Sequence, residues 1–133
     1  MSEGQAGKSI LIVEDDIDVR ETLAEVLTEE GYDAIAFAGG RAALEHLRTA
    51  EALPALILLD LMMPNMDGWE FRAEQQRSGG FTHVPTVILS ADGNVEQNMS
   101  SLHADGYLRK PIHIKTLLQL VESFCGPPAQ AAI

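Results

Sequence analysis

Residues 55–60 read ALILLD, an apolar run that ends at an aspartate. The run shows no alternation of polar and apolar side chains, which is typical of a strand buried on both faces of a parallel sheet. Ile10–Val13 and Val84–Leu89 are runs of the same kind. Weaker strand patterns lie at Asp33–Phe37 and Gly106–Arg109. The sequence therefore predicts five strands.

Helical patterns lie between these strands. Asp16 is placed to cap the first helix and Gly31 to end it, and a short helix is expected over Gly68–Arg77. Apolar residues at helical spacing mark four of the helices: Val19, Leu23, Val26 and Leu27; Ala43, Leu44 and Leu47; Val95, Met99 and Leu102; Ile114, Leu117, Leu118, Val121 and Phe124. Five strand–helix units with right-handed crossovers predict a doubly wound α/β sheet with helices on both faces.

Composition limits what the chain can be. Its 133 residues suit one domain, and 9 basic against 20 acidic residues give a net charge of −11, which repels a nucleic-acid backbone. No apolar run approaches the ~20 residues of a membrane helix. The only cysteine, Cys125, excludes an internal disulfide and suits a reducing cytoplasm. We expect a cytoplasmic protein that binds neither nucleic acid nor membrane.

Polar residues stand directly after the predicted strands. Glu14 and Asp15 follow the first strand, Asp60 the third, Ser90 the fourth and Lys110 the fifth. A helix cap accounts for one such residue but not for all of them. Ligands bind doubly wound sheets beyond the carboxyl ends of the strands. These side chains are therefore the candidates for a functional site.

A cluster of this kind requires a cation. If the first and third strands are neighbours, Glu14, Asp15 and Asp60 crowd together, and two charges ~4 Å apart repel by ~4 kcal/mol at an effective dielectric of about 20. Lys110 supplies one positive charge. Carboxylate oxygens without cysteine or suitably spaced histidine favour Mg²⁺ over zinc or copper. A permanent structural metal is the alternative interpretation.

The same residues suit phosphoryl transfer. An aspartate beside Mg²⁺ can act as a nucleophile on phosphorus and form an acyl-phosphate. The oxygens of the transferring group would be met by Mg²⁺, by the Lys110 ammonium group, and by the Ser90 hydroxyl with the backbone N–H of Ala91.

Four segments carry a family resemblance: SILIVEDD, LILLDLMMPNMDGWE, PTVILSA and DGYLRKP. Together they resemble the receiver domains of two-component response regulators, over about Lys8 to Phe124. The resemblance implies a flavodoxin-like receiver fold, with a five-stranded parallel sheet of order 2-1-3-4-5 and five helices. We interpret residues 1–7 as a flexible leader, residues 8–125 as the receiver domain and residues 126–133 as a tail.

The resemblance assigns the metal ligands and the acceptor. It implies that Glu14 and Asp15 are the acidic pair that holds Mg²⁺ and that Asp60 is both phosphoacceptor and ligand. The backbone carbonyl of Met62 would be a further protein ligand beside these three carboxylates, and Gly68 would shape the start of the following helix.

The resemblance also assigns the groups that hold the phosphoryl oxygens. These are the side chains of Ser90 and Lys110 and the backbone of Ala91. Tyr107 would be the aromatic switch that moves inward when Ser90 is drawn to the phosphate. The Lys110–Pro111 peptide bond is expected to be cis.

Two residues depart from the family pattern. Met62 stands two residues after Asp60, and its side chain cannot hydrogen-bond an attacking water; the hypothesis is that it slows loss of the phosphoryl group. His103 stands where the family often has a small residue, so the turn before the last strand is expected to differ.

The function implied is that of a single-domain response regulator. Asp60 would accept a phosphoryl group from a histidine kinase or phosphotransfer protein, and the protein, a monomer or weak dimer, would signal by a phosphorylation-dependent interaction with an unknown downstream protein. It would be a switch that assists its own phosphorylation and dephosphorylation, not an enzyme. The readout surface is expected around Val95–Ser123.

Three alternatives stay open. In the first, the chain is a receiver fragment of a hybrid kinase or multidomain regulator, and the Gly-Pro-Pro after Cys125 begins a linker. In the second, it is a degenerate receiver that binds partners without phosphorylation. Less favoured is a phosphatase with an aspartate nucleophile, because such enzymes carry a second aspartate where this chain has Met62.

Overall fold

The apolar runs of the sequence form one parallel sheet. The computed structural model describes residues 9–78, 80–91, 100 and 102–128. Its five strands pair in the order β2-β1-β3-β4-β5, which confirms the expected order. Their bounds are β1 Ser9–Val13, β2 Asp33–Phe37, β3 Leu56–Asp60, β4 Thr86–Ser90 and β5 Gly106–Arg109. Every residue of β3 and β4 is buried, as runs without alternation predict.

The two central strands differ slightly from the predicted bounds. β4 begins at Thr86 instead of Val84, because Val84 N donates to Phe81 O in a turn and Pro85 has no N–H to give to a ladder. At their other ends, β3 and β4 each extend one residue further, to Asp60 and Ser90. Two candidate site residues therefore belong to the strands themselves.

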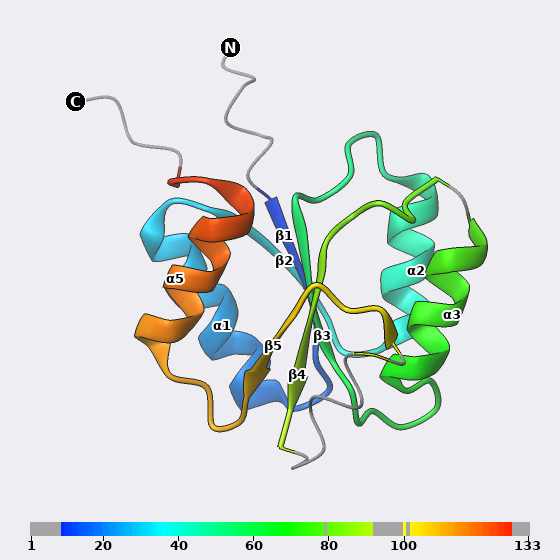
Figure 1. Cartoon of the computed structure of the whole chain (residues 1–133), viewed down its shortest axis with the longest axis horizontal. Helices are drawn as coiled ribbons and strands as arrows, with labels where there is room; N and C mark the ends of the chain where they lie inside the picture. The colour runs from blue at the N-terminus through cyan, green and yellow to red at the C-terminus, as the bar shows by residue number, and fades with distance from the viewer. Residues whose placement is uncertain (1–8, 79, 92–99, 101, 129–133) are drawn as a thin grey trace.

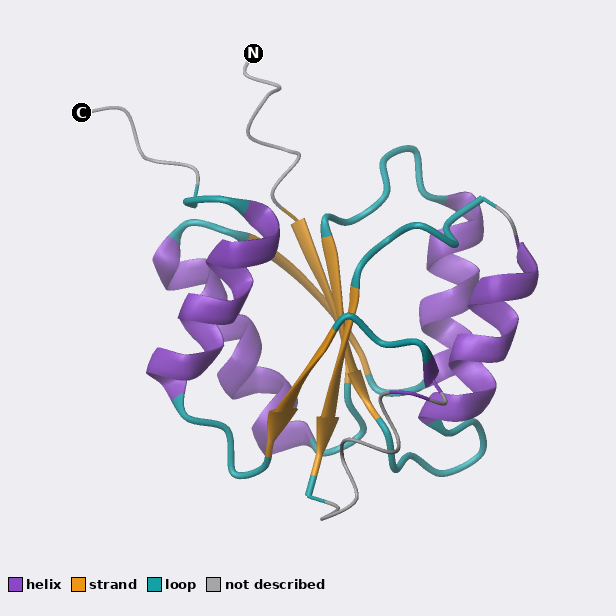
Figure 2. Ribbon diagram, viewed as in Figure 1, coloured by secondary structure: helices purple, strands orange, loops and turns teal. Residues whose placement is uncertain are grey.

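Helices cover both faces of the sheet (Figures 1 and 2). Helices α1 and α5 lie on one face, and α2 and α3 lie on the other. Their bounds are α1 Ile17–Glu30, α2 Gly40–Thr49, α3 Gly68–Ser78 and α5 Ile114–Cys125. Each pair buries its apolar side chains against the sheet, so the core has two layers.

Local signals place the ends of α1 as predicted. Asp16 Oδ1 accepts hydrogen bonds from Asp18 N and Val19 N at 2.9 and 3.1 Å. Gly31 ends the helix with φ 108°, a left-handed conformation that glycine adopts readily. Asp16 thus starts α1 directly after the acidic pair that follows β1.

The described part of the chain contains four helices, one fewer than the five expected. The helix expected around Val95 and Met99 falls on residues 92–99 and 101, outside the described ranges. Leu102, the described member of that pattern, is buried in the core layer under α2 and α3. None of the described helices is both long and apolar enough to cross a bilayer.

Candidate functional site

Three carboxylates meet at the carboxyl edge of the sheet. Val13 of β1 pairs with Leu59 of β3, so Glu14 and Asp60 leave neighbouring strands at the same level. Glu14, Asp15 and Asp60 each offer a carboxylate oxygen, and these oxygens all lie within 4.8 Å of one another. Glu14 is fully buried and Asp60 is 3% exposed, whereas Asp15 faces solvent. The structure therefore brings together the three acidic residues that the sequence singled out.

Backbone groups hold two of these carboxylates in place. Asp16 N donates to Glu14 Oε2 at 3.2 Å, and Met62 N donates to Asp60 Oδ1 at the same distance. Arg20, on the first turn of α1, donates from Nη1 to Glu14 O at 3.0 Å. Arg20 is not predictable from the sequence, because a single arginine within a helix carries no signal by itself.

Lys110 reaches the cluster from the end of β5. Its Nζ lies 2.9 Å from Glu14 Oε1 and 3.4 Å from Asp60 Oδ1, and its backbone N donates to Ser90 O. Burial lowers the pKa of Lys110, but hydrogen bonding to Glu14 and the charge of Asp60 raise it above its ordinary value overall. The ammonium group is therefore held in its charged form.

The Asp60 carboxyl is held in its neutral form. Burial is the main reason that its pKa rises from 3.8 to about 8, and hydrogen bonds with Glu14 and Asp15 add to the rise. The charge of Lys110 acts in the opposite direction. One ammonium group thus fails to balance three carboxylates, and a proton on Asp60 makes up part of the difference.

A divalent cation fits this cluster. Apart from its ion pair with Lys110, the buried Oε1 of Glu14 has no hydrogen bond among the described residues. The three side chains offer only hard oxygen atoms, which suit Mg²⁺ or Ca²⁺. The acidic cluster can therefore hold a divalent metal ion.

The remaining predicted residues stand beside this cluster. Ser90 is buried at the end of β4, the strand next to β3, and the exposed Ala91 follows it. Tyr107 lies on β5 opposite Ile88 and is 41% exposed, so it is not packed into the core. Met62 is 66% exposed, and its backbone N–H donates to Asp60 Oδ1.

Gly68 gives the loop after β3 its shape. A Cβ at this position would lie 2.9 Å from the Leu61 backbone Cα and 3.2 Å from Asp60 O. Gly68 N donates to Leu61 O at 2.9 Å, which closes the loop and starts α3. The cis peptide bond expected between Lys110 and Pro111 is present.

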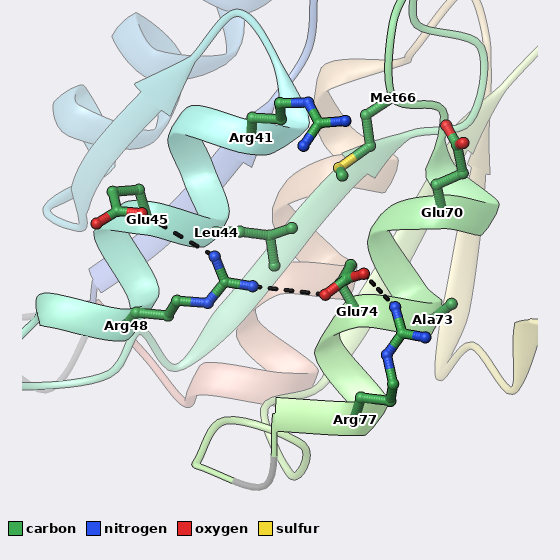
Figure 3. A pocket seen from close by; sticks show the side chains of 9 residues that line it. All are labelled: Arg41, Leu44, Glu45, Arg48, Met66, Glu70, Ala73, Glu74 and Arg77. Atoms are coloured by element: carbon green, nitrogen blue, oxygen red, sulfur yellow. Dashed lines mark hydrogen bonds and ion pairs between the residues drawn. The ribbon is translucent and has the colours of Figure 1, made fainter.

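Two of the hollows in the described part of the chain lie between helices near the site. The larger, about 490 Å³, is a groove between α2 and α3 whose charged side chains largely pair with one another (Figure 3). Arg48 bridges the two helices to Glu74, which also pairs with Arg77. The smaller, about 250 Å³, is mostly apolar and lies beside Lys110, between α1 and the Pro111–Ile114 segment. Only the smaller hollow adjoins the carboxylate cluster.

The chain is similar in sequence to known proteins. The family model described as "Response regulator receiver domain" matches residues 10–122. Response regulator MprA of Mycolicibacterium vanbaalenii is 39% identical, over 82% of this chain and 46% of its own length. The probable transcriptional regulatory protein SilR of Salmonella typhimurium is 37% identical, over 86% and 49%. The chain thus spans about half the length of the curated relatives it matches.

Solved structures show the same architecture. The chemotaxis protein CheY4 of Vibrio cholerae superimposes with a TM-score of 0.78 and 28% sequence identity. The match covers 87% of this chain and 97% of that protein's chain.

Proposed function

The chain belongs to the response regulator receiver domain family, and we propose that it is a phosphoacceptor switch in which Asp60 takes a phosphoryl group with the aid of Mg²⁺. The observation that carries this proposal is the meeting of Glu14, Asp15 and Asp60 within 4.8 Å, with Lys110 Nζ 3.4 Å from the Asp60 carboxylate. No other group of metal-ligating acidic, histidine or cysteine residues occurs among the described residues.

Glu14, Asp15, Asp60 and the Met62 carbonyl are the proposed ligands of the metal. When bound, the ion would neutralise excess carboxylate charge and the oxygens of the incoming phosphoryl group. Its charge also favours the ionised form of Asp60, whose pKa of about 8 otherwise leaves the nucleophile largely protonated at neutral pH.

The transfer itself is a displacement at phosphorus. An Asp60 oxygen forms a bond to phosphorus while the bond from phosphorus to the donor's imidazole nitrogen breaks. The leaving nitrogen keeps that electron pair, and the proton on the other ring nitrogen makes the departing imidazole neutral. Lys110, the Ser90 hydroxyl and the Ala91 N–H hold the phosphoryl oxygens as charge develops.

The donor is proposed to be a phosphohistidine on a sensor histidine kinase or phosphotransfer protein. Such a side chain must approach Asp60 from the open carboxyl edge of the sheet. The apolar hollow between α1 and Pro111–Ile114 adjoins Lys110 and offers a contact surface for the donor's chain within reach of the acceptor. A donor with a negatively charged contact surface is disfavoured, because this chain carries a net charge of −11 and would repel it.

The response is proposed to reach a downstream protein through the region around Val95–Ser123, of which the structure describes Ser100 and residues 102–123. Ser90 lies in β4 and Tyr107 in the adjoining strand β5, so a movement of Ser90 toward the phosphoryl group can be followed by Tyr107. Tyr107 is partly exposed, so its ring is not packed into the core. A local change of charge then becomes a change of binding surface.

We propose a cytoplasmic protein that acts as a single-domain regulator and is monomeric or weakly dimeric. The alternative is that the chain forms part of a longer regulator.

The test is phosphorylation by a small donor, measured by intact mass. Incubation with acetyl phosphate and Mg²⁺ is expected to add one phosphoryl group to the wild type and none to Asp60→Asn, and omission of Mg²⁺ should abolish the addition. Asp33→Asn is the matched control, since it removes an exposed carboxylate at the other edge of the sheet. Labelling that persists in Asp60→Asn would contradict the proposal, and steady turnover of a phosphate monoester would favour the phosphatase instead.

A further inference from the structure

A buried arginine lies on the opposite side of the sheet from α1 and takes no part in the site described above. Arg72, in the second turn of α3, is 6% exposed. Among the described residues it forms no ion pair, and burial lowers the pKa of its guanidinium, an effect that the charge of Asp105 partly offsets. A charge placed in this way is unfavourable unless hydrogen bonds compensate it.

Hydrogen bonds from the guanidinium connect three parts of the chain. Arg72 Nε donates to Leu102 O at 3.0 Å and Nη2 donates to His103 O at 2.7 Å. Nη1 donates to Gln75 Oε1 at 2.7 Å and to Thr86 Oγ1 at 3.3 Å. The acceptors thus come from α3 itself, from the start of β4 and from the turn before β5.

The two carbonyl groups are consecutive, and the planar guanidinium reaches both at once. A lysine would present a single ammonium group, which cannot reproduce this two-pronged geometry. His103, the second acceptor, has φ 54°, a left-handed conformation that disfavours a residue with a side chain by roughly 1–2 kcal/mol. The bond from Arg72 holds the turn in this strained conformation.

The turn held by Arg72 leads directly into β5. Asp105 N donates to Thr86 O, and Thr86 N donates to Asp105 Oδ2 at 2.8 Å, so the turn is also fastened to the start of β4. In Figure 1 this segment passes from the side of α3 to the sheet before β5 begins. Tyr107 follows two residues after Asp105.

β5 is therefore held at both ends by different contacts. At the carboxyl edge, Lys110 N donates to Ser90 O beside the phosphoacceptor. At the amino edge, Arg72 and Thr86 hold the turn. A displacement that begins at Ser90 acts on a strand whose far end is fixed.

We propose that Arg72 is a positioning residue that fixes the start of β5, so that a movement of Ser90 changes the position of Tyr107 instead of shifting the whole segment. The coupling to phosphorylation rests on the proposed function. The anchoring of the turn does not, because it is a property of the unphosphorylated protein.

The test compares Arg72→Met with Arg77→Met by hydrogen exchange and mass spectrometry. Arg77 is the matched control, since it is an exposed arginine on the same helix and forms an ion pair with Glu74. Without phosphodonor, amides of residues 102–107 are expected to exchange about tenfold faster or more in Arg72→Met, and at the wild-type rate in Arg77→Met. Equal exchange in the two variants would overturn the anchoring.

The second arm adds acetyl phosphate and Mg²⁺. Intact mass should show equal phosphorylation of the wild type and Arg72→Met, because Arg72 touches no site residue. The donor-dependent change in exchange at residues 105–109 is expected in the wild type and lost in Arg72→Met. Retention of that change in a phosphorylated Arg72→Met would overturn the coupling. Absence of phosphorylation in the wild type would count against the proposed function. In that case the first arm of the experiment still decides whether Arg72 anchors the turn.

If Arg72→Met fails to fold, Arg72→Lys provides the same comparison. The lysine side chain keeps the positive charge but can donate hydrogen bonds to fewer carbonyl groups at once. The amides of residues 102–107 should therefore exchange faster in Arg72→Lys than in Arg77→Met. A wild-type rate in the lysine variant would overturn the requirement for the guanidinium.

Discussion

Asp60 faces two opposing demands at the scale of a single residue. As a nucleophile it must be ionised, yet it is buried among other carboxylates, and its pKa is raised to about 8. Lys110 relieves this repulsion only in part, because its Nζ lies closer to Glu14 than to Asp60. The metal-free protein therefore carries unfavourable electrostatics at the residue on which the proposed chemistry depends.

Replacement of Asp60 by Asn should stabilise the metal-free protein in a pH-dependent manner. The folded carboxyl has a pKa of about 8 and the unfolded one a pKa of 3.8, so the folded state binds the proton more strongly. The wild type loses stability as pH rises through this interval, with no loss below pH 3.8 and the full loss above pH 8. At pH 8, Asp60→Asn should raise the free energy of unfolding by up to about 5 kcal/mol, since each pKa unit corresponds to about 1.4 kcal/mol.

Urea unfolding in the presence of a chelator measures this difference. At pH 4 the variant and the wild type should differ little, and the gap should widen toward pH 8. Asp33→Asn, an exposed change of the same charge, should show no such widening. If the difference in free energy of unfolding were the same at pH 4 and pH 8, the pKa of Asp60 would not be raised in the folded protein.

Met62 bears on how long the phosphoryl group persists. Met62 is 66% exposed and stands two residues after Asp60, and its thioether cannot donate a hydrogen bond or orient a water molecule as an amide can. Met62→Asn should speed loss of the phosphoryl group by about tenfold, because the amide can hydrogen-bond the attacking water. The measurement is the decay of phosphorylated mass after removal of the donor. Met62→Leu should leave the rate unchanged, and an unchanged rate in Met62→Asn would reject the hypothesis.

At the scale of elements, the site depends on how α3 meets the end of β3. The helix starts so close to Leu61 that only a glycine fits at position 68. The same helix carries Arg72, which holds the turn before β5. Helix α3 thus links the loop after the acceptor to the strand that bears Tyr107.

Gly68→Ala should destabilise the protein by about 1–3 kcal/mol, because the new Cβ meets backbone atoms of Leu61 and Asp60 that have little freedom to move. Urea unfolding at neutral pH gives the value. Gly80→Ala is the control, since a Cβ there meets nothing within 4 Å. Equal free energies of unfolding in the two variants would mean that the loop after β3 accommodates the added methyl group without loss of stability.

At the scale of the whole molecule, topology gathers residues that are far apart in sequence. The order β2-β1-β3-β4-β5 puts β1 beside β3, so that Glu14 meets Asp60, and it puts β5 beside β4, so that Lys110 approaches Ser90. All of these residues follow or end strands that run in one direction, and they therefore share one edge. Three carboxylates, two of them buried, therefore meet at this edge.

The amino-acid sequence by itself determined the strands, the caps of α1 and the positions at which charged residues follow strands, because these features depend on local periodicity and on turn chemistry. Only the tertiary structure decided that Lys110 pairs more closely with Glu14 than with Asp60, that Asp60 holds its proton, and that Arg72 spans three segments. Those properties depend on strand register and on exclusion of water, which arise when distant segments pack together and which no local pattern encodes.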